Sequence, residues 1–294
     1  MTWRKHMQRT GTNGSTSRRI RLLASTAAAA AALVGSGFTP AAAPATAAPA
    51  TSQQTERAGV HSIRVITYNV GDKSAPTLRA QLSRLLDRKP AVLGLQEVAD
   101  RKDLLKQVAR ANPGYRLFQK DYGPVSRHNA ILVRKRGVTV LDDGAKLLTE
   151  AANVEKGTAG AKDGIAARKW VNWVRIKTDG LRWTAGVVHL VASAERLGGL
   201  TRKLHLEQVA RCAAWWKGLK SEPLLMGDFN ATLGHRYNLL EKLRDRAKPW
   251  TDESHDNRAI DYVWSKRNAK GTVKALDGFG GDHKPVQVDL TVTR

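Results

Sequence analysis

The chain has 294 residues, a formal net charge of +23 at pH 7 and a hydrophobic content of 41%. It contains one cysteine, Cys212, which excludes an internal disulfide, so its stability must come from a hydrophobic core. We find no internal repeat and no linker after residue 59, which favours one large domain over two small ones.

The first 47 residues have the pattern of a secretion signal. Arg18 and Arg19 precede Leu22, Leu23 and an alanine-rich apolar run that extends to about residue 34. The paired arginines are typical of the twin-arginine export route, but Arg21 stands where an aromatic residue is usual, so both export routes stay open. The run is shorter than the roughly 20 apolar residues that a membrane span needs.

We therefore expect cleavage after Ala47, a secreted protein and no stable membrane insertion. Residues 48–60 are expected to form a flexible linker, and residues 61–294 the folded domain. Cleavage would remove six basic residues and no acidic ones, which leaves 247 residues with a net charge of +17. That charge attracts polyanions such as nucleic acid, anionic lipid or acidic glycans; solubility or adhesion to an anionic cell wall is the alternative explanation.

Strand and helix patterns alternate in the first part of the domain. Residues 63–70 form an apolar run typical of a strand, and leucines at helical spacing follow it before Pro90. Residues 91–95 indicate a short buried strand, and residues 100–110 a second helix.

Strands dominate the second part. Apolar runs predict them over residues 130–133, 138–141, 170–176, 181–190, 223–226, 260–264, 271–276 and 285–293. A turn at Asp179 and Gly180 predicts a hairpin, and residues 201–220 a long helix. Residues 150–168 are rich in Gly and Ala, and we expect a flexible loop that covers a site or is disordered. The whole pattern predicts an α+β fold of two packed sheets with helices outside them.

Polar side chains stand at the ends of six of the apolar runs. They are Asn69, Glu97, His189, Asp228 with Asn230, Asp261, and Asp282 with His283. A buried strand that ends in a polar residue holds that residue out as a ligand. If the six ends converge, they form a pocket lined by carboxylates and imidazoles, as a divalent metal and a phosphoryl group require.

Each of these residues alone has an ordinary structural interpretation. Glu97 could lie at the surface, the segment from Asp228 to Asn230 could be a simple turn, and His189 could be a core histidine. Asp261 lies inside an apolar strand, where an unpaired charge is costly and a hydrogen bond to a histidine ring would satisfy it. The ordered set is far more specific than its parts.

At this point the sequence resembles the endonuclease/exonuclease/phosphatase superfamily, as a secreted bacterial member, over about residues 63–290. The resemblance implies the DNase I-like fold, a four-layer α/β/β/α sandwich of two mixed sheets flanked by helices. It implies that Asn69 in TYNV lies beside the metal and the phosphate, and that Glu97 in LQEV is the principal Mg²⁺ ligand. Asp282 in GGDHKP would be a further acid on the metal side.

The other motifs imply catalytic roles. His189 in VVHL would be a general acid or a phosphate contact. In GDFN, Asp228 would activate or position the attacking water, and Asn230 would hold a phosphoryl oxygen. Asp261 in IDYVW would be the partner of His283, the second catalytic imidazole.

The sequence departs from two subgroups of this family. Gly71 stands where some DNA-repair members carry a second acid, which disfavours that subgroup. Pancreatic-type DNases place an acid before the strand at residue 130, to orient the first histidine, but this chain has Arg127, His128 and Asn129 there. The acidic partner of His189 is therefore open. Arg127 and Asn129 are candidate substrate contacts, although a solvated loop arginine is equally compatible.

The leading prediction is a secreted, Mg²⁺-dependent phosphodiesterase, a nuclease that cuts DNA, with RNA as an alternative substrate and Mn²⁺ or Ca²⁺ as alternative cofactors. We expect a monomer with nucleic acid as its substrate. The alternative is a sphingomyelinase-like or inositol-phosphatase-like enzyme of the same fold that acts on phospholipid head groups, an option that several tryptophans keep open. A second alternative is an inactive basic module that binds nucleic acid.

Overall fold

The computed structural model describes residues 59–123 and 125–294. The predicted secretion signal and the linker up to residue 58 lie outside the described residues. Among the residues that are described, no helix is long and apolar enough to cross a membrane.

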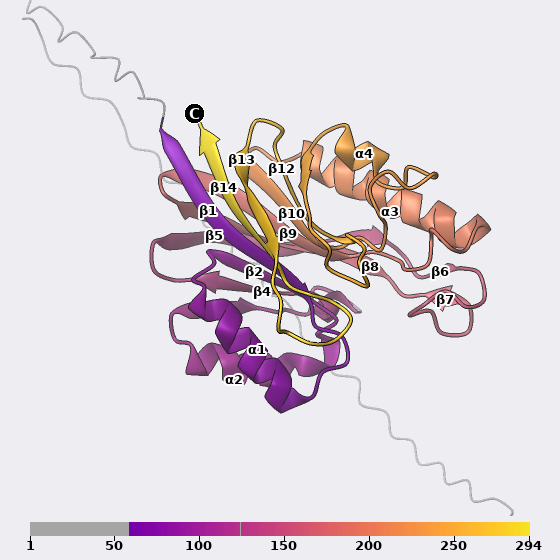
Figure 1. Ribbon diagram of the computed structural model, residues 1–294, viewed down its shortest axis with the longest axis horizontal. Coiled ribbons are helices and arrows are strands. Elements are labelled where there is room, and N and C mark those ends of the chain that lie inside the picture. The colour runs from indigo at the N-terminus through magenta and orange to yellow at the C-terminus, as the bar shows by residue number, and fades with distance from the viewer. Residues whose placement is uncertain (1–58, 124) are drawn as a thin grey trace, which may run out of the picture. The chain divides into compact units, whose positions relative to one another are not determined.

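Two six-stranded mixed sheets lie against each other (Figure 1). The first sheet has the order β13 (Lys270–Ala275), β14 (Val286–Thr293), β1 (Val60–Asn69), β2 (Val92–Gln96), β4 (Ala130–Arg134) and β3 (Tyr115–Phe118). The second has the order β11 (Lys248–Trp250), β12 (Asp261–Ser265), β10 (Glu222–Asp228), β9 (Leu181–His189), β8 (Lys169–Thr178) and β5 (Val138–Thr149). β1 pairs with β2 in parallel and β9 with β10 in parallel, whereas the other pairs are antiparallel.

Helices cover the outer face of each sheet (Figure 1). α1 (Ala75–Asp87) and α2 (Lys102–Ala111) bury their leucines against the first sheet, and α3 (Gly199–Lys217) and α4 (Glu241–Arg244) pack on the second. Ser74 caps α1 by accepting a hydrogen bond from Thr77 N. The first turn of α1 contains a proline, whose missing N–H costs nothing there because first-turn N–H groups have no acceptor within the helix. The predicted four-layer α/β/β/α sandwich is confirmed.

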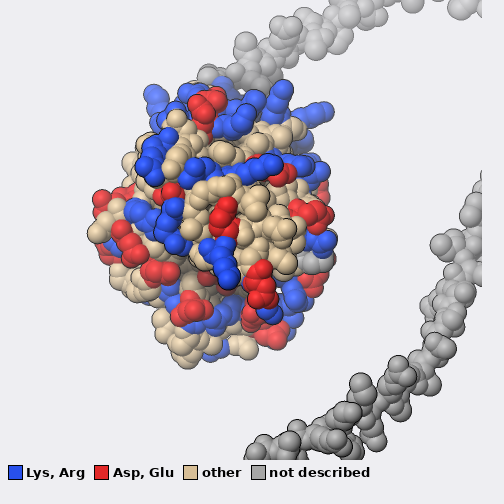
Figure 2. All heavy atoms as spheres, turned by 90° about the vertical axis from the view of Figure 1, so that its right-hand side faces the viewer, with Lys and Arg blue, Asp and Glu red and all other residues tan. Residues whose placement is uncertain are grey.

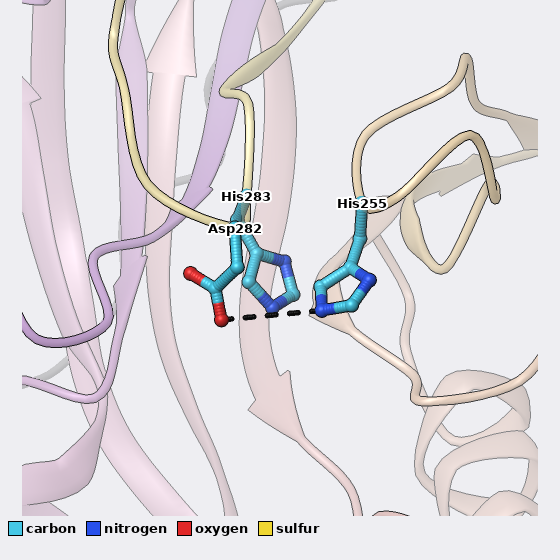
Figure 3. A group of neighbouring side chains, drawn as sticks. All are labelled: His255, Asp282 and His283. Atoms are coloured by element: carbon cyan, nitrogen blue, oxygen red, sulfur yellow. Dashed lines mark ion pairs between the residues drawn. The ribbon is translucent and has the colours of Figure 1, made fainter.

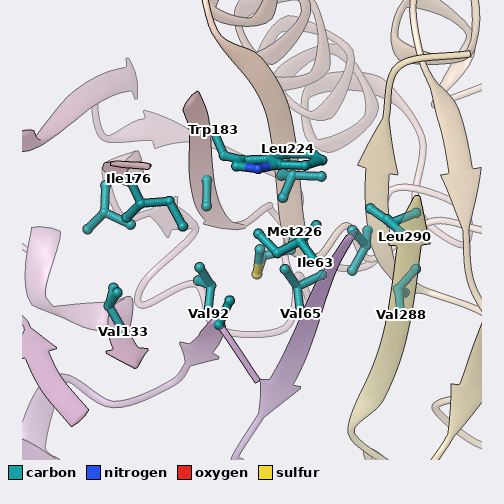
Figure 4. Packing of buried hydrophobic residues seen from close by; sticks show 14 of the residues in the cluster. Ile63, Val65, Val92, Val133, Ile176, Trp183, Leu224, Met226, Val288 and Leu290 are labelled. Atoms are coloured by element: carbon teal, nitrogen blue, oxygen red, sulfur yellow. The ribbon is translucent and has the colours of Figure 1, made fainter. Parts of the chain in front are cut away.

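The space between the sheets is filled by alternate residues of the central strands, because side chains along a strand point to opposite faces in turn. Val65 of β1 packs there with Leu224 and Met226 of β10, and Trp183 of β9 closes one end (Figure 4). Full burial of such side chains stabilises the fold by about 1.5–3 kcal/mol each. Because this alternation continues to the strand ends, alternate side chains of the last residues also face the space between the sheets.

The structure adds elements that the sequence did not indicate. Strands β3 and β11, the one-turn helix α4 and two 3-10 turns, η1 (Ala99–Arg101) and η2 (Ser126–His128), were not predicted. Residues 150–168, expected to be a flexible loop, contain the strand pair β6 (Ala152–Asn153) and β7 (Ile165–Ala166).

This segment is fixed to the N-terminus of α3. Val154 and Ala166 pack on Leu204 of that helix. The carboxylate of Glu155 accepts hydrogen bonds from the backbone N–H groups of Leu200 and Thr201, both at 2.6 Å. A carboxylate at this position satisfies donors that a helix leaves unpaired in its first turn, so Glu155 secures the segment to the start of α3.

Candidate active site

Three of the predicted catalytic residues form one row across the second sheet. Asp228 is in register with His189 on β9 and with Asp261 on β12. Leu224 and Met226 on the same strand point into the core between the sheets, so Asp228 points the same way by the two-residue repeat. The row therefore lies where the apolar core gives way to a polar pocket.

The first sheet adds Asn69 and Glu97 from the ends of β1 and β2. Asn69 Nδ2 donates to Glu97 Oε1 at 2.9 Å and to Asp228 Oδ2 at 3.0 Å, which ties the two sheets together at the site. Gly71 N donates to Asn69 Oδ1 at 3.1 Å and fixes the orientation of the amide. Glu97 has a φ of +62°, an uncommon backbone state for a residue other than glycine, and this turn directs its side chain into the pocket.

Asp228 is only 1% exposed, and both of its carboxylate oxygens are held. Oδ1 accepts from Asn230 N at 2.8 Å, while Oδ2 accepts from Asn69. Burial, assisted by the charge of Asp261, raises the pKa of Asp228 to about 7. A carboxylate with this pKa can take a proton from water near neutral pH. Asn230 has a φ of +50°, and its side chain donates to Leu190 O at 3.2 Å.

His283 forms a buried pair with Asp261. Its Nδ1 lies 2.8 Å from Asp261 Oδ2, and its Nε2 lies 3.7 Å from Asp228 Oδ2. Burial opposes protonation of the ring, but the hydrogen bond to Asp261 and the charge of that residue outweigh it and raise the pKa of His283 to about 9. At neutral pH His283 is therefore a cation whose Nε2–H faces the pocket.

His189 has the opposite electrostatic environment. Burial lowers its pKa well below the ordinary value, and the positive charges of Lys169 and His283 lower it further. Its ring is neutral at pH 7, so it serves as a hydrogen-bonding group. Its acidic neighbours are Asp228, with an Nε2–Oδ2 distance of 3.6 Å, and Glu97, with an Nε2–Oε1 distance of 3.8 Å. Both distances exceed hydrogen-bonding range and involve the same ring nitrogen, so neither residue replaces the acid that residues 127–129 lack.

These residues open on a cavity of about 290 Å³. Its lining residues are Glu97, His128, Ala159, Gly160, Ala166, Ala167, Arg168, Lys169, His189, Leu190, Val191, Ala192, Asp228, Asn230, His255, Asp282 and His283. Burial lowers the pKa of Lys169 to about 8, although Asp228 and Glu97 favour its charged form. The segment of residues 150–168, which we expected to cover a site, forms one wall.

The two predicted substrate contacts do not line this cavity. Arg127 Nε lies 3.0 Å from Asp121 Oδ1 in an exposed ion pair. Asn129 is 3% exposed, and its Nδ2 donates to the backbone carbonyl of Trp170 at 3.2 Å. Their role in substrate binding stays a prediction, whereas the adjacent His128 does face the cavity.

Two further residues at the site were not selected from the sequence. His255 lies with Asp282 and His283 at the cavity, and its ring centroid is 4.5 Å from that of His283 (Figure 3). Lys73 is 8% exposed and donates to Val70 O at 2.8 Å. Burial lowers the pKa of Lys73, against the charges of Asp282 and Glu97. Both residues stand in polar stretches without strand periodicity, so the sequence held no signal for them.

The oxygen ligands at the pocket fit Mg²⁺. This ion is usually held by one or two carboxylates, keeps several waters and binds substrate phosphates. The side chain of Glu97 is 41% exposed and that of Asp282 is 58% exposed. The negative charge of each raises the pKa of Lys73. Asn69, through its bond to Glu97, would orient the first of these carboxylates.

No family model and no curated protein matches the sequence. Solved structures do match: an endonuclease/exonuclease/phosphatase family protein from Bacteroides thetaiotaomicron superposes with a TM-score of 0.62 at 16% identity, over 79% of this chain and 98% of that one. The chain has the endonuclease/exonuclease/phosphatase fold. The DNase I-like fold that the sequence resemblance implied is confirmed.

Other proteins that share the endonuclease/exonuclease/phosphatase fold differ in what they act on. A mannosyl-6-phosphatase from Bacteroides thetaiotaomicron has a TM-score of 0.59 at 16% identity, over 78% of this chain and 99% of its own. D. rerio TDP2, complexed with a single-strand DNA product, has a TM-score of 0.55 at 13% identity, over 79% of this chain and 99% of its own. Structural matches at identities this low establish the fold but not the substrate.

Proposed function

We propose that this protein is a secreted, Mg²⁺-dependent phosphodiesterase that hydrolyses DNA and also accepts RNA. One observation carries the proposal: Glu97, His189, Asp228 and His283, from the ends of strands of both sheets, converge on a single cavity, and Asn69 bonds to the first and third of them. Two proteins of the same fold support phosphoester chemistry, since one is named a phosphatase and another was solved with a DNA product.

Asp228 is the base in this mechanism. Its carboxylate is held by Asn69 and by the backbone of Asn230, so its orientation is set before substrate binds. Because its pKa is near 7, it can take a proton from a water that attacks phosphorus. The new bond joins the water oxygen to phosphorus as the bond to the leaving oxygen breaks.

His283 is the acid. Asp261 holds the ring and keeps it protonated, so Nε2–H can donate to a phosphoryl oxygen and pass its proton to the leaving oxygen. Neutral His189 and the Lys169 cation would contact the phosphoryl group. General acid–base help of this kind contributes about 10²–10⁴-fold in rate. Mg²⁺ bound through Glu97 would neutralise charge on the phosphoryl oxygens.

The surroundings of the cavity favour a polymeric anion. A second cavity of about 320 Å³ shares Asn230 and His255 with the first and is lined also by Arg196 and Arg258. Arginines beside a catalytic pocket suit the flanking phosphates of a nucleic acid, which they would contact without reading its sequence. Figure 2 shows Lys and Arg gathered along the top of one face, with acidic groups more frequent lower down.

The tryptophans that kept a lipid substrate open lie inside the fold. Trp216 and Trp250 are buried, and Trp170, Trp173 and Trp215 are partly buried. Since an aromatic side chain must be exposed to enter a lipid surface, these positions favour nucleic acid over a phospholipid head group.

The test incubates the protein in Mg²⁺ with each of three substrates: supercoiled plasmid, sphingomyelin and a phosphoinositide. A chelator is then added to each reaction. We expect plasmid cleavage that stops on chelation and returns with Mg²⁺. Asp228→Asn should lower the rate at least about 10²-fold. Lys106→Ala should leave it unchanged, because that residue pairs with Asp103 on α2, outside the cavity.

Head-group release with intact plasmid would instead establish a lipid-acting enzyme. An absence of turnover with DNA binding retained would indicate the inactive binding module. Secretion and the monomeric state belong to the same proposal. They are tested by the N-terminal sequence of exported protein, expected to begin after Ala47, and by its mass in solution.

A further inference from the structure

A second group of potential ligands lies at the mouth of the proposed catalytic pocket (Figure 3). His255 comes from the loop between β11 and β12, and Asp282 and His283 come from the loop between β13 and β14. One ligand atom from each residue lies within 4.8 Å of the others. Two imidazoles and one carboxylate suit Zn²⁺ and similar transition metals, whereas Mg²⁺ prefers oxygen ligands.

The two loops are joined by their backbones, so the three ligands are held near each other before any ion binds. His255 and His283 form an antiparallel bridge. Next to it, Lys284 N donates to Ser254 O at 2.7 Å. His255 is fixed from the other side too, because its N–H donates to Arg258 O at 3.0 Å and its carbonyl accepts from Arg258 N at 2.7 Å.

His283 is already oriented as a metal ligand. Its Nδ1 is bonded to Asp261 Oδ2 at 2.8 Å, which leaves Nε2 facing the cavity. Histidines that bind metals usually donate their other ring N–H to a carboxylate, which fixes the tautomer and strengthens the ligand. This bond lies outside the three-residue group, so it is an independent sign of a metal site.

The ligand atoms lie within 4.8 Å of one another and have to move closer together to bind one ion. Ligand atoms bound tetrahedrally at about 2.0–2.1 Å from Zn²⁺ lie about 3.4 Å apart. His255 Nε2 and Asp282 Oδ2 are 3.9 Å apart. Because the side chain of Asp282 is 58% exposed, a rotation of this carboxylate can close the gap.

We propose that His255, Asp282 and His283 bind one Zn²⁺ ion, which displaces the Nε2 proton of His283 to solvent, and that this binding inhibits hydrolysis because it occupies the Nε2 atom of His283. That atom cannot hold a metal ion and deliver a proton to the leaving oxygen at the same time. Asp282 is also withdrawn from the Mg²⁺ side of the pocket. The inhibition, unlike the binding, rests on the proposed phosphodiesterase function.

Binding is tested first, without any assay of activity. The full protein is freed of metal with a chelator and titrated with Zn²⁺ by calorimetry, and with Co²⁺ by its visible absorption. We expect one ion per chain and at least a tenfold weaker affinity in His255→Gln. His61→Gln, which alters a partly buried histidine beside Asp179, and Glu97→Gln should both bind Zn²⁺ as the parent does. Equal affinity in His255→Gln and the parent would overturn the site.

Inhibition is tested second, in the Mg²⁺ plasmid assay. Added Zn²⁺ should stop the parent, and His255→Gln should need at least tenfold more Zn²⁺ for the same fractional inhibition. Equal sensitivity would show that Zn²⁺ inhibits from another site, and Zn²⁺ binding at His255 without loss of rate would refute the inhibition. If the parent never cleaves a phosphoester, the function fails while the binding result stands separately.

Discussion

Replacement of His205 should make the protein more resistant to acid. His205 lies on α3 with no exposed surface, and its Nε2 is 2.7 Å from Phe229 O, between the catalytic Asp228 and Asn230. The neutral ring donates Nε2–H to that carbonyl, and its buried Nδ1 has no partner among the described residues. Burial lowers the pKa of His205 to about 4, so in the folded protein the ring stays neutral where an unfolded chain would protonate it.

The sign and size follow from this difference in pKa. The ordinary pKa is 6.5 and the folded value is about 4, so between these pH values the unfolded chain binds more protons. Stability is therefore unaffected above about pH 6.5 and falls as the pH decreases towards 4. At 1.36 kcal/mol per pKa unit, the loss is about 1.4 kcal/mol at pH 5.5 and about 3 kcal/mol at pH 4.

Urea unfolding of the parent and of His205→Gln at pH 7, 5.5 and 4 measures this loss. The glutamine amide can still donate to Phe229 O but does not titrate, and all other groups cancel in the comparison. We expect the parent to lose about 3 kcal/mol more than the variant between pH 7 and pH 4. If the free energies of unfolding of the parent and of His205→Gln fall in parallel as the pH decreases, His205 is not a buried neutral group and the reasoning is wrong.

Three other changes test separate parts of the structure. Asp261→Asn should lower kcat about 10²-fold with little change in KM, because it removes the charge that keeps the catalytic imidazole protonated; an unchanged kcat would contradict that role. Lys169→Met should raise the pKa of His189, because the charge of the lysine lowers that pKa. An NMR titration measures the shift. An unchanged pKa would show that the two groups are too far apart to interact. Gly94→Ala should lower the free energy of unfolding in urea by about 1–3 kcal/mol, because the new Cβ would lie 2.7 Å from a valine of the facing sheet. Gly114→Ala is the control, since the space around that residue is open.

The layered fold could be predicted because its central strands are long, apolar and end in polar residues. Val65 and Asn69 lie on one face of β1, so the residues that build the core also indicated where the site begins. Strand β11 could not be found in this way. It is three residues long and contains Pro249, which breaks a strand pattern, and it forms only because β12 offers a free edge.

The parts of the site that the sequence missed depend on contacts between distant segments. His255 stands in a polar loop and gains its position from its bridge to His283. Glu155 orders its segment by reaching the start of α3, 45 residues further along the chain. Neither contact leaves a local periodic pattern, so both were outside the reach of sequence reasoning.

The row of His189, Asp228 and Asp261 has a consequence for how such a protein can change over evolution. Because the three are held in register, one residue inserted into β10 before Asp228 would turn that carboxylate to the helix-covered face and abolish the site. The segments at residues 150–168 and 251–259 lie outside these three strands, so a change in their length does not shift the register of the row. Changes in the length and composition of these segments can therefore alter the walls of the cavity, whereas a change in the length of the strands would break the row.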